Sequence, residues 1–366
     1  MSDTEAPEVE ADVRRRLDAT LLELCSIASP IGEERTLCDA VQRRLTKLDL
    51  AAPIRRYGDS IVVPVTRGRG PRIALVGHLD TVRTENGPAR IEGDRCFGSG
   101  ASDMKSGLAV MVALAEALPP AAPRCDLTLV FYAREEGPFA DNELGPVLDQ
   151  DPELGAVDLA VCMEPSDNKL HLGCVGSIHA TVSFRGRTAH SARPWEGDNA
   201  ITQAGAFLAE LRALPPTESR IEGLTYRSVT TVTQARDGGR GRNVVPDLFV
   251  LNVNRRFAPD ISLEEARRDL IALVGGRAEI EFTDLSPAAR PSAEHPLVRA
   301  LVASGVRGVE PKQAWTDVAR FAARGVAAVN FGPGENAQAH QKNESTSLAL
   351  VHEGFAITAR WLGSIA

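Results

Sequence analysis

Short runs of consecutive apolar residues recur along the first half of the chain. The runs are residues 61–65, 73–76, 127–131 and 159–163. Because apolar side chains fill consecutive positions instead of alternating with polar ones, each run is typical of a strand buried on both faces, as in a mostly parallel α/β sheet. Three longer segments have apolar residues at helical spacing and are predicted helices: residues 13–25, 36–48 and 104–118.

The pattern changes near residue 175. Residues 179–184 alternate between apolar and polar side chains, which is typical of a half-buried strand. Further strands are predicted at residues 228–233, 248–256 and 278–282, and helices at residues 199–214 and 263–274. The resulting order, β-α-β-β-α-β, is that of a split-βαβ, or ferredoxin-like, layer.

The first pattern returns after residue 287, with a predicted helix at residues 296–306 and a buried strand at residues 326–331. At 366 residues, the chain exceeds a typical single domain core. We therefore expect an α/β protein of two domains. One is discontinuous and contains residues 1–175 and 287–366, and the other, residues 176–286, is inserted into it.

Composition and charge exclude several classes of protein. Hydrophobic residues make up 43% and charged residues 25%, as is usual for a soluble globular enzyme. The net charge of −8 argues against a nucleic-acid partner, because such proteins usually carry a basic face. No apolar run approaches the ~20 residues that cross a membrane, and the acidic N-terminal residues do not resemble a signal peptide, so we expect a cytoplasmic protein. The six cysteines form no CxxC pair and are expected to be buried, reduced thiols.

Chemically reactive side chains follow the predicted strands at the points where these end. In chain order they are His78, Asp80, Glu135, Glu136 and Glu164, and a further carboxylate, Asp103, lies in a glycine-rich loop just before the helix 104–118. In open α/β sheets, ligands bind outside the carboxyl ends of the strands. We therefore expect these side chains to meet at one rim of the sheet.

Each of these residues also has an ordinary structural interpretation. A histidine after a strand is often a packed or surface residue, and Asp103 before a helix would by default be an N-cap. Together, however, several acids at one rim would repel one another unless a cation neutralised them. Histidine and carboxylates without thiolates are the ligands of catalytic zinc or a similar divalent metal. The chain has neither a Gly-x-Ser-x-Gly elbow nor a correctly placed GxGxxG loop, which argues against a serine nucleophile and a nucleotide site.

Five motifs in order resemble the zinc aminoacylase and carboxypeptidase family, with its di-zinc exopeptidase fold and inserted lid domain. They are His78-Leu79-Asp80, residues 100–107, Glu135-Glu136, Glu164-Pro165 and a late His340. The resemblance extends from about residue 15 to the end of the chain. It implies that His78, Asp103 and Glu164 bind one Zn²⁺. It also implies that Asp103, Glu136 and His340 bind the second, so that Asp103 bridges the two ions; Co²⁺ or Mn²⁺ could substitute.

The resemblance assigns further roles. It implies that Asp80 orients the imidazole of His78 through its carboxylate, and that Glu135 is the general base for the attacking water. It implies a cis peptide bond after Asp103. His190 lies in the motif of residues 187–194, whose histidine in family members reaches across a dimer interface to the other active site. A homodimer through the inserted domain is therefore expected.

The substrate is expected to be a small N-acyl amino acid rich in carboxylates. Arginine grips carboxylates with two parallel hydrogen bonds, and several arginines lie in the predicted insertion. Asn243 and Arg256 match family positions on the substrate's α-carboxylate side, and Arg193 and Thr316 are the further candidates for substrate contacts.

Three stretches, residues 189–194, 315–321 and 329–334, are most similar to desuccinylases of actinobacterial type. They predict hydrolysis of N-succinyl-LL-2,6-diaminopimelate to succinate and LL-diaminopimelate. Trp315 before Thr316 departs from the other desuccinylase branch, which leaves alternatives open. These are an acetylornithine or N-acyl-citrulline deacetylase, and a dipeptidase or glutamate carboxypeptidase of the same family. An alternative of another class is a non-catalytic, metal-stabilised binding protein.

Overall fold

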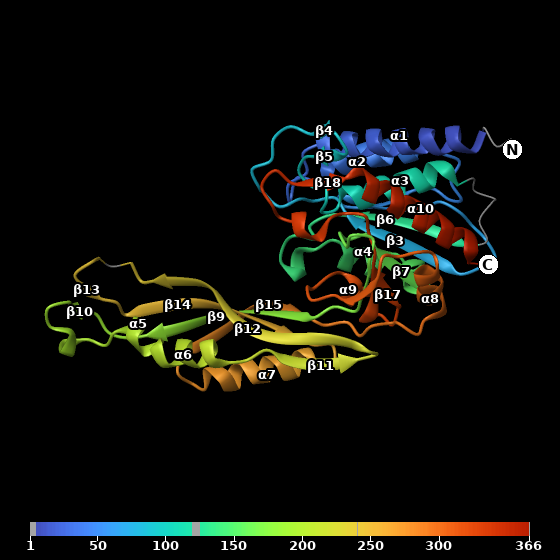
Figure 1. Ribbon diagram of the computed structural model, residues 1–366. Coiled ribbons are helices and arrows are strands. Elements are labelled where there is room, and N and C mark those ends of the chain that lie inside the picture. Colours follow the sequence, from blue (N-terminus) through green and yellow to red (C-terminus); the bar gives the residue numbers. More distant parts are fainter. Residues whose placement is uncertain (1–4, 119–124, 240, 366) are drawn as a thin grey trace. The chain divides into compact units, whose positions relative to one another are not determined.

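A computed structural model describes residues 5–118, 125–239 and 241–365, and the chain divides into two compact units (Figure 1). The first unit contains the described residues of Met1–Gly173, Ser292–Glu310 and Arg320–Ala366. The second contains those of Cys174–Pro291 and Pro311–Ala319. The sequence predicted an insertion of residues 176–286, whereas the second unit extends over Cys174–Pro291 and also includes Pro311–Ala319.

A mixed sheet forms the centre of the first unit (Figure 1). Its described strands follow the order β1 (Arg55–Tyr57), β2 (Ser60–Pro64), β6 (Asp126–Tyr132), β3 (Arg72–His78), β7 (Leu159–Cys162), β17 (Ala328–Asn330), β8 (Leu170–Leu172) and β16 (Val309–Pro311). The four central strands, β6, β3, β7 and β17, are parallel. Strands β2 and β8 flank them in antiparallel orientation, so the predicted parallel sheet is confirmed at its centre.

Helices lie around this sheet (Figure 1). They are α1 (Glu5–Ser26), α2 (Arg35–Leu45), α3 (Lys105–Ala117), α4 (Leu144–Gln150), α8 (Pro296–Ala303), α9 (Val318–Ala322) and α10 (Leu348–Ser364). Helix α3 is buried on every face, from Lys105 to Ala115, because α1, α2 and α10 surround the side that the sheet does not cover (Figure 1). An apolar helix of this kind belongs in a core.

Two glycines allow α3 to approach the ends of the central strands. A Cβ atom on Gly77 of β3 would lie 2.5 Å from Leu108 Cδ2, and one on Gly107 of α3 would lie 2.4 Å from the Met163 carbonyl oxygen. A larger residue at Gly107 would meet main chain and push α3 away from β7, whereas one at Gly77 would displace the ends of flexible side chains of α3. These contacts determine where the loop before α3 lies relative to the strand ends.

The second unit has its own sheet and core. The sheet order is β11 (Thr217–Ile221), β12 (Leu224–Asp237), β14 (Leu248–Phe257), β9 (Gly176–Arg185) and β15 (Glu279–Ser286). Helices α5 (Ala200–Gln203), α6 (Gly205–Ala213) and α7 (Leu263–Val274) cover one face, where Phe184, Phe207, Val253 and Leu270 are fully or almost fully buried. The predicted β-α-β-β-α-β order is confirmed. Strand β11 extends it, and the helix predicted at 199–214 is divided into α5 and α6.

The segment 311–319 packs within the second unit. The indole Nε1 of Trp315 donates to the Pro287 carbonyl at 3.0 Å, and the main-chain N–H of Arg227 donates to Gln313 Oε1 at 2.9 Å. These bonds explain why the inserted domain, as predicted from the sequence, lacked residues 311–319. Partners of this segment lie far away in the sequence, so no local pattern reveals them.

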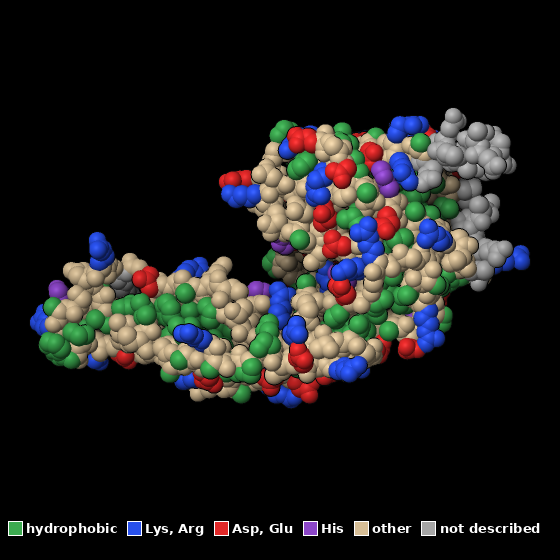
Figure 2. Space-filling model, viewed as in Figure 1, with side chains coloured by type: hydrophobic (Ala, Val, Ile, Leu, Met, Phe, Trp, Pro, Cys, Tyr) green, Lys and Arg blue, Asp and Glu red, His purple; other side chains and the backbone are tan. Residues whose placement is uncertain are grey.

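The remaining described elements are short. Strands β4 (Arg90–Glu92), β5 (Arg95–Phe97) and β18 (Ser345–Ser347) form one small sheet, and β10 (Ala189–His190) pairs with β13 (Val244–Val245). One-turn helices span Phe139–Asp141, Leu154–Ala156, Pro194–Glu196 and Asn336–Gln338. All six cysteines are buried and free, which confirms the predicted thiols. Within the described ranges, no helix has the length and apolar character needed to span a bilayer. Basic and acidic side chains are interspersed on the visible face of each unit (Figure 2).

Candidate metal centre

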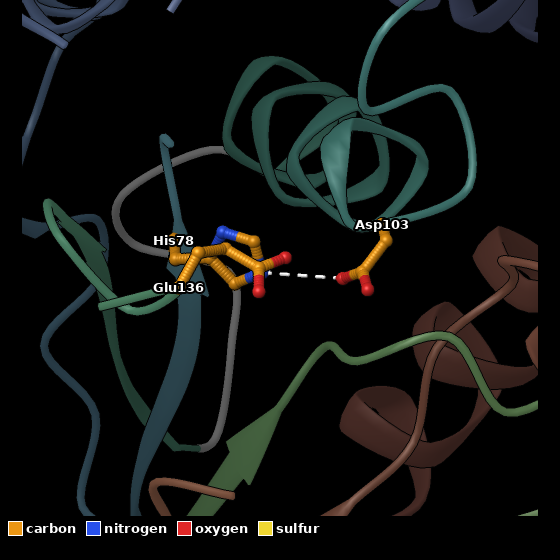
Figure 3. A group of neighbouring side chains, drawn as sticks. All are labelled: His78, Asp103 and Glu136. Atoms are coloured by element: carbon orange, nitrogen blue, oxygen red, sulfur yellow. Dashed lines mark hydrogen bonds and ion pairs between the residues drawn. The ribbon is translucent and has the colours of Figure 1, made fainter. Parts of the chain in front are cut away.

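Three adjacent parallel strands carry candidate ligands at or just beyond their carboxyl ends. His78 is the last residue of β3, Glu136 follows β6, and Glu164 follows β7. Since β3 pairs with both β6 and β7 in parallel, the three strands end at the same rim. Asp103 comes from the loop before α3 and points toward the ring of His78 (Figure 3). Ligand atoms of His78, Asp103 and Glu136 all lie within 4.8 Å of one another.

Asp103 lies between two histidines. Its Oδ1 is 3.2 Å from His78 Nε2, and its Oδ2 is 3.6 Å from His340 Nε2. His340 Nε2 is also 3.0 Å from Glu136 Oε1. A carboxylate that presents one oxygen to each of two imidazoles has the arrangement that a bridging ligand requires. The sequence placed His78, Asp103, Glu136 and His340 in one cluster, and the structure brings them together.

The two histidines differ in burial but both lie in an acidic environment. The side chain of His78 is 1% exposed and that of His340 is 54% exposed. Burial lowers the pKa of His78, but hydrogen bonds to Asp103 and Asp80 and the charge of Glu164 outweigh it, so that the pKa is raised well above its ordinary value. The hydrogen bond to Glu136 raises the pKa of His340 to about 9. The carboxylates thus stabilise positive charge at both rings.

Asp80 uses its main chain and its side chain for different purposes. His78 Nδ1 lies 2.9 Å from the main-chain oxygen of Asp80 and 3.6 Å from its Oδ1. A carbonyl oxygen can only accept, so Nδ1 carries a proton, and in the neutral ring Nε2 presents its lone pair to the cluster. The carboxylate of Asp80 accepts the main-chain N–H of Glu135 at 3.0 Å and that of Glu136 at 2.8 Å. The carbonyl is the nearer contact to the ring, and the Asp80 carboxylate also acts on the ring by raising the pKa of His78. That this carboxylate orients the imidazole stays a prediction.

Backbone geometry around the cluster is unusual. Arg134, just before the Glu135-Glu136 pair, has φ of 65°, and His340 has φ of 61°. Residues other than glycine rarely adopt this left-handed region, and such residues concentrate at functional sites. The peptide bond between Asp103 and Met104 is cis, as the family resemblance implied. Met104 rather than Asp103 occupies the N-cap position of α3, and no side chain caps the helix there, so the ordinary interpretation of Asp103 is wrong.

Glu135 and Glu164 are further candidate site residues, and the distances given above for the cluster do not involve them. Glu135 is half-buried, and its main chain is held by Asp80, as described above. Glu164 is 6% exposed, and its charge acts on His78. The roles of general base and metal ligand stay predictions for these two residues.

The candidates in the second unit are described by their own surroundings. His190 and Arg193 are exposed, and the N–H of Ala192 donates to His190 Nδ1 at 3.1 Å. The carbonyl of Asn243 accepts the N–H of Ser191 at 2.9 Å, which joins β10 to the strand that follows Asn243.

Arg256 and Thr316 are more enclosed. Arg256 is half-buried and donates through Nε to Asn254 Oδ1 at 3.0 Å, and burial lowers its pKa. Thr316 is 3% exposed, and its hydroxyl has no hydrogen-bond partner among the described residues. Contact of Arg193, Asn243, Arg256 and Thr316 with a substrate stays a prediction, and so does the role of His190.

Sequence reasoning did not find Glu344. Its side chain is 2% exposed and accepts main-chain N–H groups from the loop that carries Asp103. The available signal was its position four residues after His340, in the motif that contains this candidate ligand. A role could not be derived from this spacing, because the partners lie about 240 residues earlier in the chain.

Comparison with known proteins shows the family. The sequence profile of peptidase family M20/M25/M40 matches residues 74–364, and the chain belongs to this family. A candidate succinyl-diaminopimelate desuccinylase, DapE, of Mycobacterium tuberculosis is 38% identical over 342 residues, which cover 93% of this chain and 96% of the relative. The succinyl-diaminopimelate desuccinylase of Corynebacterium glutamicum is 35% identical over 347 residues, with coverage of 93% and 94%.

Solved structures agree on the fold. The M20 family metallo-carboxypeptidase Sso-CP2 of Sulfolobus solfataricus superimposes with a TM-score of 0.78 at 15% identity, over 95% of this chain and 98% of that one. The YXEP protein of Bacillus subtilis, a dinuclear metal-binding peptidase of the M20 family, gives a TM-score of 0.68 at 15% identity, over 97% and 100%. The protein is therefore a hydrolase that acts on amides, and it carries a candidate metal site of imidazoles and carboxylates. Imidazoles and carboxylates are a suitable donor set for a divalent ion.

Proposed function

We propose that the protein hydrolyses N-succinyl-LL-2,6-diaminopimelate to succinate and LL-diaminopimelate, with two Zn²⁺ ions in the cluster around Asp103. The observation that carries the proposal is the position of Asp103, whose two carboxylate oxygens lie 3.2 and 3.6 Å from two different histidine rings. The substrate follows from the two desuccinylase relatives, which align with nearly the whole chain at 38% and 35% identity.

In this proposal, His78 and Glu164 would hold one ion, Glu136 and His340 would hold the other, and Asp103 would be a ligand of both. When bound, the ions supply Lewis acidity and lower the pKa of water at the site. The chain prepares this donor set through hydrogen bonds. The Asp80 carbonyl holds the proton of His78 on Nδ1, and the Asp80 carboxylate holds the turn that carries Glu136. Groups that orient ligands in this way strengthen metal binding.

We assign the proton transfers to Glu135. Its carboxylate would accept the proton of the attacking water and later return a proton to the leaving amino group. The hydrogen bond from its main-chain N–H to Asp80 fixes the residue next to Glu136, a proposed ligand. The base and the metal site are therefore held by one carboxylate, that of Asp80.

Recognition of the substrate is assigned to the second unit and to a dimer. We propose that Arg256, Arg193, Asn243 and Thr316 contact the substrate, because its carboxylates require cationic and hydrogen-bonding partners. The pKa of Arg256 is lowered by burial, and an anionic ligand would compensate for the lost solvation. His190 would act in the active site of the partner subunit of a homodimer. We also propose that the protein works in the cytoplasm with zinc as its metal.

The substrate and the metal can be tested in one experiment. The purified protein is loaded with zinc and assayed for amide hydrolysis on N-succinyl-LL-diaminopimelate, N-acetylornithine, N-acetylcitrulline and several dipeptides, each with and without chelator. We expect cleavage of the succinyl substrate, abolished by chelator and restored by added zinc. Cleavage of a different member of the panel would preserve the metal chemistry and overturn the substrate. Zinc binding without any cleavage would favour a non-catalytic binding protein.

A further inference from the structure

Glu344 is a buried carboxylate that is not among the proposed ligands. It is 2% exposed. Its Oε1 accepts the main-chain N–H groups of Ser102 and Asp103, both at 2.8 Å, and its Oε2 accepts the N–H of Gly100, also at 2.8 Å. Three main-chain donors in one short loop therefore converge on a single side chain. A buried carboxylate bound by several N–H groups forms strong, charge-assisted hydrogen bonds.

The loop that Glu344 holds is the one that presents Asp103. In the turn before a helix, an aspartate commonly caps main-chain N–H groups with its own side chain. Here Glu344 takes up the N–H of Asp103 itself, and no side chain caps α3 at Met104. The Asp103 carboxylate is instead directed at the rings of His78 and His340. Glu344 thus accepts the hydrogen bonds of the loop N–H groups, and the Asp103 carboxylate can face the two histidines instead of capping the loop.

Glu344 also belongs to the segment that carries His340. Its main-chain N–H donates to Asn86 Oδ1 at 2.8 Å, and its carbonyl accepts the N–H of Gly98 at 3.1 Å. The main chain and the side chain of Glu344 together hold the segment that contains His340 against the loop of residues 98–103. Glu344 in this way connects two proposed ligands that lie far apart in the sequence, Asp103 and His340.

We propose that Glu344 is a positioning residue that sets Asp103 against His340, and that the zinc site shared by these two ligands forms at full affinity only while its three hydrogen bonds are intact. The inference rests on the proposed function, since it concerns the same metal centre. Two oxygens serve three donors, which is the task of a carboxylate. A glutamine would turn its amide N–H toward one main-chain N–H and leave that donor unsatisfied in a buried place.

The test compares zinc binding by the wild type and by Glu344→Gln. Metal-free protein is titrated with zinc chloride by calorimetry in the presence of a competing chelator. We expect two sites in the wild type, and in the variant a loss of about 10–100-fold in affinity at the weaker site. The zinc concentration that gives half-maximal activity should rise by the same factor.

Asp151→Asn is the matched control. Asp151 is fully buried and accepts hydrogen bonds from Arg55 Nε at 2.7 Å and from the N–H of Glu153 at 3.1 Å. It precedes the start of β7, whereas the cluster lies beyond the strand's other end. This variant should lose stability and keep wild-type affinity for zinc. If Glu344→Gln does not fold, Glu344→Asp, which keeps the charge but is one methylene shorter, should show the same loss of affinity.

The outcomes separate the two proposals. Wild-type zinc affinity in a folded Glu344 variant would overturn the positioning role alone. An equal loss of affinity in Asp151→Asn would also overturn it, because general destabilisation would then explain both. A wild-type protein that binds no zinc would overturn the proposed function and this inference together.

Discussion

At the residue scale, the cluster depends on carboxylates that do not themselves face the proposed ions. Asp80 accepts the main-chain N–H groups of Glu135 and Glu136, and Glu344 accepts three from the loop of Asp103. Each of these carboxylates fixes the main chain of a loop through hydrogen bonds. The fixed main chain then orients the side chain that belongs to the cluster. A side chain on a turn that is bound in this way loses less freedom when it binds a ligand.

Replacement of Asp80 separates its two functions. In Asp80→Asn, the main-chain carbonyl still faces His78 Nδ1, but the amide can accept from only one of the two N–H groups of Glu135 and Glu136. We expect kcat per bound zinc to fall by roughly 10–100-fold because the turn that carries Glu135 is held less firmly, and zinc affinity to fall as well because the same turn carries Glu136. Steady-state kinetics and metal analysis of the purified variant measure both quantities. Loss of zinc with an unchanged kcat per bound zinc would instead mean that the carboxylate acts on the metal ligands alone and does not position Glu135.

The sequence predicted much of the site because its motifs are local. His78 and Glu136 follow apolar runs that could only be buried strands, and the parallel sheet brings such strand ends together. Glu344 could not be found in the same way. Its hydrogen bonds join residues about 240 positions apart, and a single glutamate in a polar loop has no pattern of its own.

At the element scale, a predicted helix is confirmed at both ends where local residues form recognisable caps. Helix α7 begins and ends at the predicted residues, because Ser262 and Glu265 form a capping box and Gly275 adopts a left-handed conformation at the other end. Strand β11 was missed because its residues are mostly exposed and polar, so that only pairing with β12 defines it. The second unit therefore has one strand more than its hydrophobic pattern indicates.

The close approach of α3 to β7 gives a prediction at this scale. A methyl group on Gly107 would lie 2.4 Å from the Met163 carbonyl, next to Glu164. We expect Gly107→Ala to destabilise the protein by about 1–3 kcal/mol through overpacking, although alanine favours helices by about 1 kcal/mol. Urea unfolding measures the change. Gly205→Ala in α6 is the control, because nothing lies within 4 Å of its added Cβ, and it should be neutral or stabilising. Equal effects at both glycines would contradict the steric argument.

At the scale of the whole molecule, the proposed role of His190 involves a second copy of the chain. The first unit contains the candidate cluster, whereas His190 is an exposed residue of the short strand β10 in the second unit. The first unit alone can supply the ligands, the base and the hydrogen bonds that orient them. If the family resemblance holds for His190, each active site is completed by a histidine from the partner subunit, and activity requires a dimer.

Complementation between two inactive variants tests this requirement. Glu135→Gln removes the base and His190→Ala removes the partner histidine, so we expect each homodimer to have very little activity. In a mixed dimer, one site combines an intact Glu135 with His190 from the other subunit. Random pairing of equal amounts should restore about a quarter of the wild-type activity, since half of the dimers are mixed and each has one complete site. Co-expression with two affinity tags isolates the mixed dimers for assay. If His190 acted within its own chain, the mixed dimers would stay inactive, because neither subunit contains both residues.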